Sequence, residues 1–184
     1  AEENSYATSY IPTLTGTTQT RVEETCGGAG SSSSINSEEG VLYAEISALS
    51  NDLTTRRITL SDGTSNDRII LQYQNSSNRF RCLLVVGGVT QFDTSLVSET
   101  ITNFNKVAVK YKENDFALWI NGVKVYSNLT GNTFASSTLN KISFDGGTGS
   151  NPFYGNTKDL RVYNTALSDE ELIYLTGTLG EDYY

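Results

Sequence analysis

The sequence predicts an all-β protein that forms one large domain. Its length of 184 residues fits a single sheet domain. Only 18% of the residues are charged and 37% are hydrophobic, and glycine occupies 16 positions. This composition is typical of sheet proteins with many polar turns. Short segments of alternating character, separated by turn-forming residues, indicate the same fold class.

The strands of the first half are predicted from alternation and turn signals. In the segment 40–46, one side carries Leu42, Ala44 and Ile46, and the other carries Val41, Tyr43 and Glu45. Further strands are predicted over 57–60, 68–73 and 80–86. Asp62-Gly63 is a strong turn signal between the first two, and Gly87-Gly88 ends the third.

Hairpins are predicted in the last third of the chain. Strands over 107–112 and 116–121 are followed by a strand over 123–126. Asn121-Gly122 joins the last two, because this pair accepts the positive φ angles of a type I′ turn.

One short helix is predicted near the end of the chain. Ser168 is a good N-cap, and Glu171 at the third helical position completes a capping box. We expect the helix to end before Gly177 and to cover an open end of the sheet structure.

This order of strand, hairpin, strand, loop, strand and short helix resembles the laminin-G-like, concanavalin A-like lectin-glucanase jelly roll found in phage tail and bacterial surface proteins. The resemblance covers roughly residues 36–176. It implies a two-sheet antiparallel β-sandwich with one short helix in its C-terminal region. We expect residues 1–25 to form an extended lead-in from a preceding domain, and residues 26–184 to form the jelly roll.

The charge, hydrophobicity and cysteine content of the chain limit its possible partners and covalent links. The net charge of −8 argues against nucleic acid as a partner, because an acidic surface repels phosphates. No segment approaches 18 apolar residues, so we expect no membrane insertion. Cys26 and Cys82 allow two interpretations: two buried or half-buried thiols, or one disulfide that ties the N-terminal region to a central strand.

The residue types argue against catalysis. The chain has no histidine, which removes Ser-His-Asp and Cys-His catalysis and His-ligated zinc. Glycoside hydrolysis needs two facing carboxylates, but the Glu-x-Asp-x-x-Glu pattern of jelly-roll glucanases is absent and Glu45 stands alone on its strand. We therefore predict a protein that is not an enzyme, without two close carboxylates in a cleft.

The candidate ligand-binding residues are Trp119, Tyr43, Asn121 and Tyr154. If Phe116, Leu118 and Ile120 face the core, Trp119 and Asn121 face outward. An outward Trp or Tyr ring can stack on a sugar. The alternative is that Trp119 packs beneath a loop or against a neighbouring domain.

The candidate metal ligands are Asp145 and Asn151, in the glycine-rich loop 145–152. The resemblance implies one calcium ion at the rim of the sandwich, bound by Asp, Asn and backbone oxygens. Asp62 and Asp67, which flank another turn, are a second possible pair. The alternative is plain turn chemistry, since Asp-Gly and Asn-Pro favour turns by themselves.

The function that the resemblance implies is carbohydrate binding without catalysis. We expect an adhesin-like module of a phage tail or bacterial surface protein, outside the cell or on a virion. Its partners would be cell-surface glycans or glycoproteins, and neighbouring domains or subunits. The alternative is a structural or decoration domain of a virion or fibre that contacts only proteins.

Overall fold

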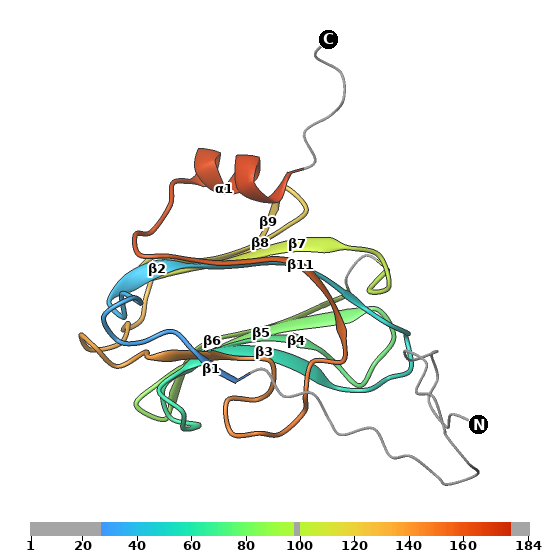
Figure 1. Ribbon diagram of the computed structural model, residues 1–184. Helices are drawn as coiled ribbons and strands as arrows, with labels where there is room; N and C mark the ends of the chain where they lie inside the picture. Colours follow the sequence, from blue (N-terminus) through green and yellow to red (C-terminus); the bar gives the residue numbers. More distant parts are fainter. Residues whose placement is uncertain (1–26, 98–99, 178–184) are drawn as a thin grey trace, which may run out of the picture.

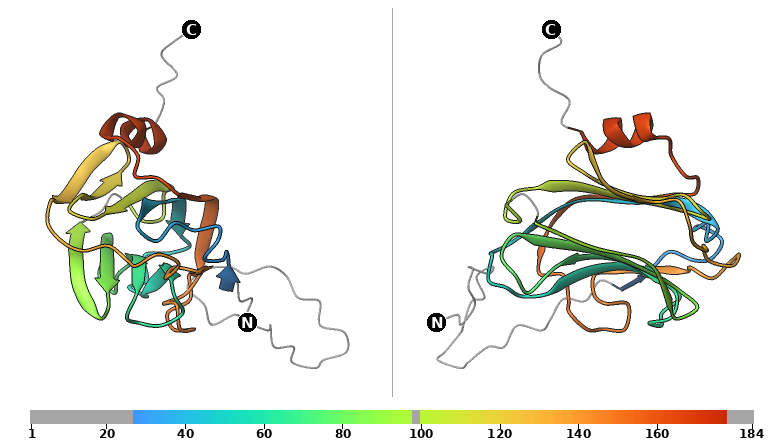
Figure 2. Two further views of the ribbon diagram at one scale, coloured as in Figure 1. Left: turned by 90° about the vertical axis from the view of Figure 1, so that its left-hand side faces the viewer. Right: turned by 180° about the vertical axis from the view of Figure 1, so that it is seen from behind.

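The molecule is a sandwich of two antiparallel sheets with a single helix packed on the outside of one of them (Figure 1). The computed structural model describes residues 27–97 and 100–177. The view from behind in Figure 2 also shows the two layers, one above the other. The predicted fold class, an all-β two-sheet jelly roll with one short helix, is confirmed.

Sheet A has six strands. In spatial order they are β1 (Gly27–Ala29), β10 (Lys141–Ser143), β3 (Arg56–Ser61), β4 (Arg68–Tyr73), β5 (Arg79–Val86) and β6 (Val89–Val97). The strands β3, β4 and β5 lie at its centre, in a register that places Thr59 opposite Ile70 and Ile70 opposite Leu83. This register sets which side chains gather on the face that points away from sheet B.

Sheet B has five strands. In spatial order they are β11 (Gly155–Tyr163), β2 (Glu39–Ala48), β7 (Asn105–Lys112), β8 (Phe116–Ile120) and β9 (Val123–Asn128). In β2, Tyr43 pairs with Ala108 of β7 on one side and with Arg161 of β11 on the other.

The core between the sheets follows the predicted alternation. Leu42, Ala44 and Ile46 of β2 are buried there, whereas Val41 and Tyr43 belong to a separate cluster on the outside of sheet B. Phe116, Leu118 and Ile120 also face the core, and Ala117 and Trp119 face outward. Alternation is therefore followed on both sheets, because successive strand residues point to opposite faces.

Two tight turns connect strands through glycine. Asn121 and Gly122 have φ angles of 49° and 83°, as the predicted type I′ turn requires. Gly87 and Gly88 also have positive φ angles, of 55° and 78°, and they join β5 to β6. The predicted strand over 80–86 ends at this pair, and the strand that follows it, β6, was not predicted.

The helix α1 spans Asp169–Thr176 and has the predicted caps. The Ser168 side chain accepts a hydrogen bond from the Glu171 backbone, the Glu171 side chain accepts one from Ser168, and Gly177 is the C-cap. The expected position was wrong: the helix lies on the outer face of sheet B, where Leu172 packs against the outward residues of the strands, and not over an open end of the sandwich (Figure 1).

The remaining expectations concern the termini, the cysteines and membranes. The lead-in over 1–25 and Cys26 lie outside the described residues. Cys82 is a free thiol that is fully buried in the core on β5, in agreement with the first of the two interpretations. In the described part of the chain, no helix has the length and apolar character needed to cross a membrane.

Candidate functional site

Trp119 faces away from the core, as predicted, but its ring is covered. It is 3% exposed and lies in a cluster with Val41, Ala117 and Leu172 of α1. Lys124 covers part of the ring, with its Nζ 5.3 Å from the ring centre. A ring in this position has no open face for a sugar. The structure therefore matches the alternative interpretation, packing beneath another segment, which here is a helix and not a loop.

Tyr43 lies in the same covered cluster. It is also 3% exposed, and the Arg161 guanidinium carbon is 5.9 Å from the centre of its ring. Burial, followed by the nearby charges of Glu45 and Asp159, raises the pKa of Tyr43 to about 12. Tyr43 is thus a packing residue of the outer face of sheet B, not an open sugar platform.

Asn121 is exposed, but its side chain holds the turn together. Its Oδ1 accepts a hydrogen bond from the Lys106 backbone at 2.9 Å, and its Nδ2 donates to Oδ1 of Asn105 at 3.0 Å. Both ends of the amide are therefore already used by the protein.

Tyr154 differs from the other three candidates because it is an aromatic residue with open surface. It is 40% exposed and ends the loop that leads from β10 to β11. In that loop the Asn151 carbonyl accepts a hydrogen bond from the Arg57 backbone at 3.2 Å. Three residues span about 11 Å at most, so Tyr154 lies within roughly that distance of the residues at the start of β3.

The predicted metal ligands are in this same loop. Oδ1 of Asp145 accepts a hydrogen bond from the Gly147 backbone, and the Asp145 carbonyl accepts one from Oγ1 of Thr59 at 2.6 Å. Asn151 adopts a φ of 55°, which is turn chemistry. Within 27–97 and 100–177, no group of three or more His, Cys, Asp or Glu side chains could hold a metal ion.

The charges around the loop suit an anion better than calcium. The guanidinium of Arg68 reaches the Gly146 carbonyl, at 3.5 Å, and that of Arg57 lies beside the same glycine. Two cations repel a third. At the second possible pair, Asp62 accepts hydrogen bonds from Thr64, and Asp67 accepts one from the Gly87 backbone. Both carboxylates therefore stabilise turns. Calcium binding stays a prediction, and neither pair of candidate ligands offers a favourable set of donors for it.

The outer face of sheet A carries a group of side chains that the sequence analysis did not select. We call it the arginine face, and its central residues are Arg57, Thr59, Arg68, Ile70, Gln72, Arg81, Leu83 and Val85. The strand register places Gln72 between Arg57 and Arg81, and Ile70 between Thr59 and Leu83. In Figure 1, this face is turned downward, and the loop between β10 and β11 projects beyond it.

Hydrogen bonds fix two of the three arginines at their positions on this face. Nε of Arg57 donates to Oε1 of Gln72 at 2.8 Å. Arg81 forms a bidentate ion pair with Asp93, at 2.8 and 2.7 Å. Arg68 is less well satisfied, because its Nε is buried without a hydrogen-bond partner.

The positive charges on the arginine face affect one another. Burial is the largest cause that lowers the pKa of Arg57, and repulsion from Arg68 and Arg81 adds to it. Burial and repulsion from Arg81 likewise lower the pKa of Arg68. The face is therefore electropositive on a chain whose net charge is −8.

A signal for the arginine face was present in the sequence. Each arginine directly precedes a core residue of its own strand: Arg57 precedes Ile58, Arg68 precedes Ile69 and Arg81 precedes Cys82. Alternation alone therefore places all three on the outside of the sheet. Their gathering beside one loop depends on strand order and on long-range contacts, which the pattern of a single strand does not give.

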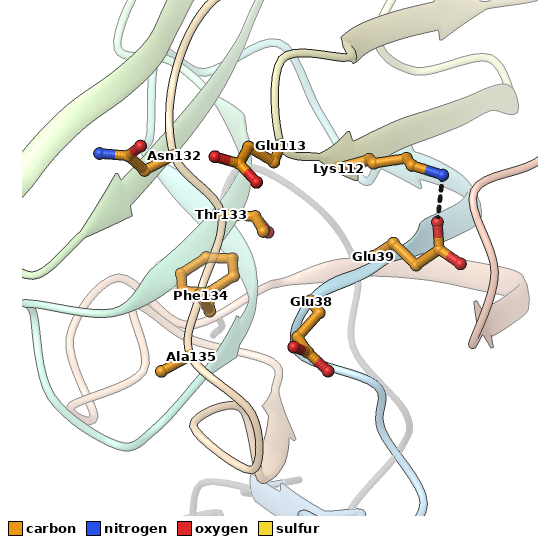
Figure 3. A pocket seen from close by; sticks show the side chains of 8 residues that line it. All are labelled: Glu38, Glu39, Lys112, Glu113, Asn132, Thr133, Phe134 and Ala135. Carbon is orange, nitrogen blue, oxygen red and sulfur yellow. Dashed lines mark ion pairs between the residues drawn. The ribbon is translucent and has the colours of Figure 1, made fainter.

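A pocket of about 520 Å³ opens at one end of the sandwich (Figure 3). Its lining residues are Glu38, Glu39, Lys112, Glu113, Asn132, Thr133, Phe134 and Ala135. Lys112 points toward Glu39 and pairs with it at 2.8 Å. Three glutamates thus line this pocket, one of them paired with Lys112, and the absence of two close, facing carboxylates in a cleft stays a prediction. The pocket is acidic, in contrast to the arginine face.

This combination of two antiparallel sheets, with strand order and capping helix as described, defines a laminin-G-like, concanavalin A-like jelly roll. The model of the concanavalin A-like lectin/glucanases superfamily matches residues 34–173 of the chain. The chain belongs to this superfamily, which confirms the sequence resemblance. Among curated proteins, none matches the sequence.

Several solved structures share the fold at low sequence identity. The CBM40 of the Ruminococcus gnavus IT-sialidase, bound to α2,3-sialyllactose, is 20% identical with a TM-score of 0.64, over 85% of this chain and 97% of that one. Domain 4 of the Geobacillus stearothermophilus arabinanase AbnA, in complex with arabinotriose, is 14% identical with a TM-score of 0.61, over 80% and 70%. The binding domain of botulinum neurotoxin DC, in complex with rat synaptotagmin II, is 14% identical with a TM-score of 0.57, over 76% and 35%.

Proposed function

We propose that this chain is a non-catalytic carbohydrate-binding module that holds a glycan against the arginine face. The observation that carries the proposal is the difference between the two outer faces of the sandwich. Helix α1 covers that of sheet B and packs beside Trp119, and Tyr43 is buried in the same cluster. The arginine face instead presents partly exposed hydrogen-bond donors beside a loop.

The chemistry of the arginine face suits a sugar. Carbohydrates present many hydroxyl acceptors, and the partly exposed Arg57 and Arg68 supply donors on neighbouring strands. The apolar residues Ile70, Leu83 and Val85 of the same face are buried and support it from below. Sites for small ligands combine an apolar lining with a few fixed polar groups. Tyr154, at the end of the adjoining loop, adds an exposed ring that could stack on a second sugar unit.

The comparisons support this choice without deciding it. Two proteins with the same fold are solved with sugars bound, sialyllactose in one and arabinotriose in the other. A third is solved with a protein, which keeps the structural alternative open as an outcome of the test. Because one fold serves many functions, the proposal depends on the residues of the arginine face.

The proposed setting is a phage tail or a bacterial surface protein, outside the cell or on a virion. It follows from the resemblance of the sequence, and a module that binds cell-surface glycans suits it. The proposed partners are those glycans or glycoproteins.

An array of neutral and acidic glycans tests the proposed function. We expect binding by the wild type, with the recovered glycan intact, in calcium and in chelator. Leu83→Trp should block the arginine face without changing its charge, and Val123→Trp is the matched control on sheet B, at a residue that is 61% exposed. Absence of binding to any glycan, or unchanged binding by Leu83→Trp, would contradict the proposal. Binding that chelator abolishes would instead support the calcium prediction.

A further inference from the structure

We propose that the arginine face selects sugars that carry a negative charge, a carboxylate or a sulfate, and that Arg57 and Arg68 hold that charge. This inference rests on the proposed function, because it names the class of ligand for the same site. It goes beyond carbohydrate binding in predicting which glycans the site accepts and which it does not.

The two guanidinium groups converge on one point of the loop. Arg57 comes from β3 and Arg68 from β4, on neighbouring strands. Nη1 of Arg68 is 3.5 Å from the Gly146 carbonyl, and Nη1 of Arg57 would lie 3.3 Å from a Cβ added at Gly146. Arg57 and Arg68 therefore meet beside Gly146, where a single anion could contact both.

Neither arginine is neutralised by the described part of the chain. Most other cations of the described residues have carboxylate partners, in the pairs Arg56–Asp52, Arg81–Asp93, Lys110–Asp115, Lys112–Glu39, Lys124–Asp169, Lys158–Glu45 and Arg161–Asp159. Within 27–97 and 100–177, no carboxylate forms an ion pair with Arg57 or Arg68. Two adjacent cations without a carboxylate partner among the described residues, on a chain of net charge −8, form a site for an anion.

The donors of these arginines are largely available. Arg57 uses Nε for Gln72, which orients its guanidinium and leaves the other nitrogens to face the loop. The Arg68 contact with the loop, at 3.5 Å, is too long for a strong hydrogen bond. Burial, followed by repulsion from Arg68 and Arg81, lowers the pKa of Arg57, so an anion beside these guanidinium groups would offset an unfavourable interaction.

The geometry of guanidinium groups explains the expected selectivity. A planar fork of N–H donors matches the two oxygens of a carboxylate or sulfate in a bidentate pair. The buried strip of Ile70, Leu83 and Val85 beneath it strengthens such a pair by excluding water. Arg81 is not part of this clamp, since Asp93 already occupies its fork.

Calorimetry with three matched sugars tests the inference. The probes are α2,3-sialyllactose, 3′-sulfolactose and lactose, which carry a carboxylate, a sulfate and no charge. We expect at least one charged probe to bind about tenfold or more tightly than lactose, and raised salt to weaken that binding. A higher affinity for sialyllactose would identify a carboxylate ligand, and a higher affinity for sulfolactose would identify a sulfate.

Charge-removing variants locate the anion. Arg57→Gln and Arg68→Gln should each weaken binding of the charged probe about tenfold or more. Lys112→Gln, which removes a charge from an exposed lysine on sheet B, is the control and should not weaken it. Lactose binding as tightly as the charged probes, or arginine variants that bind like wild type, would overturn the inference and leave carbohydrate binding intact. If the array shows that no glycan binds at all, both proposals fail.

Discussion

The two outer faces of the sandwich differ in what covers them. On sheet B, Val41, Ala117 and Trp119 form an apolar surface that Leu172 of α1 closes. On sheet A, a comparable apolar strip is flanked by arginines and a loop, without a helix of the described chain over it. One face has thus become part of the folded interior, while the other keeps charged groups at the surface. The comparison shows that an outward aromatic residue on a strand indicates a binding site only if no other segment packs on it.

The strongest test of this comparison is Trp119→Ala. We expect it to lower the free energy of unfolding by about 3–5 kcal/mol, because it removes a large buried ring beneath α1. Under conditions where the variant is still folded, its glycan affinity should equal that of the wild type. Chemical denaturation measures the first effect and calorimetry the second. An affinity loss in the folded variant would instead return the ligand site to sheet B.

A smaller effect is expected from the hydroxyl of Tyr43 at alkaline pH. Its pKa is raised to about 12 from an ordinary value of 10, so the folded state holds the proton more tightly than the unfolded state. The stabilisation is complete below pH 10 and is lost as the pH rises from 10 to 12. Tyr43→Phe should therefore reduce the decline in stability over this range. Tyr174→Phe, at a residue that is 70% exposed on α1, is the control and should leave the decline unchanged.

The cap of the covering helix should contribute about 1 kcal/mol. Ser168→Ala removes the side chain that accepts a hydrogen bond from the Glu171 backbone. Because α1 covers sheet B and not the arginine face, stability should fall without any change in glycan affinity. Thermal melting together with calorimetry checks both parts. Full stability in the variant would show that packing of Leu172 alone holds the helix.

The sequence predicts correctly those features of the fold that a few neighbouring residues specify. The capping box of α1 and the Asn121-Gly122 turn were predicted correctly, since a few neighbouring residues specify each of them. The position of α1 on sheet B was not predicted, because it depends on contacts between the helix and strands that are far away in the sequence. The strand β6 was not predicted although Gly87-Gly88 is a hairpin signal. On its core-facing side, Thr94 lies between Phe92 and Leu96, which weakens the apolar pattern.

The candidate site was harder to predict for the same reason. Trp119 is the single tryptophan of the chain, and its burial is decided by a helix about fifty residues later in the sequence. The contact between Arg68 and Gly146 joins residues that are 78 positions apart. No pattern within one strand reveals such a pair. Alternation could have placed the arginines outside the sheet, but only the strand order brings them to one loop.

The smallest effect expected is that of Gly146→Ala, and it acts on the arginine face alone. A Cβ at this position would lie 2.8 Å from Oγ and 2.9 Å from the backbone carbonyl oxygen of Ser150, and 3.3 Å from Nη1 of Arg57, so the loop must move. We expect glycan affinity to fall a few-fold, and stability to fall as well because the backbone of the loop has to shift.

Gly149→Ala separates contact from backbone strain in the same loop. Gly149 has a φ of 86°, which disfavours alanine, but an added Cβ would meet nothing within 4 Å. This variant should lose some stability while it keeps its affinity, whereas Gly146→Ala should lose both. If both variants bound glycan like the wild type, the loop beside Arg57 and Arg68 would not contact the ligand, and the anion would have to lie farther along sheet A.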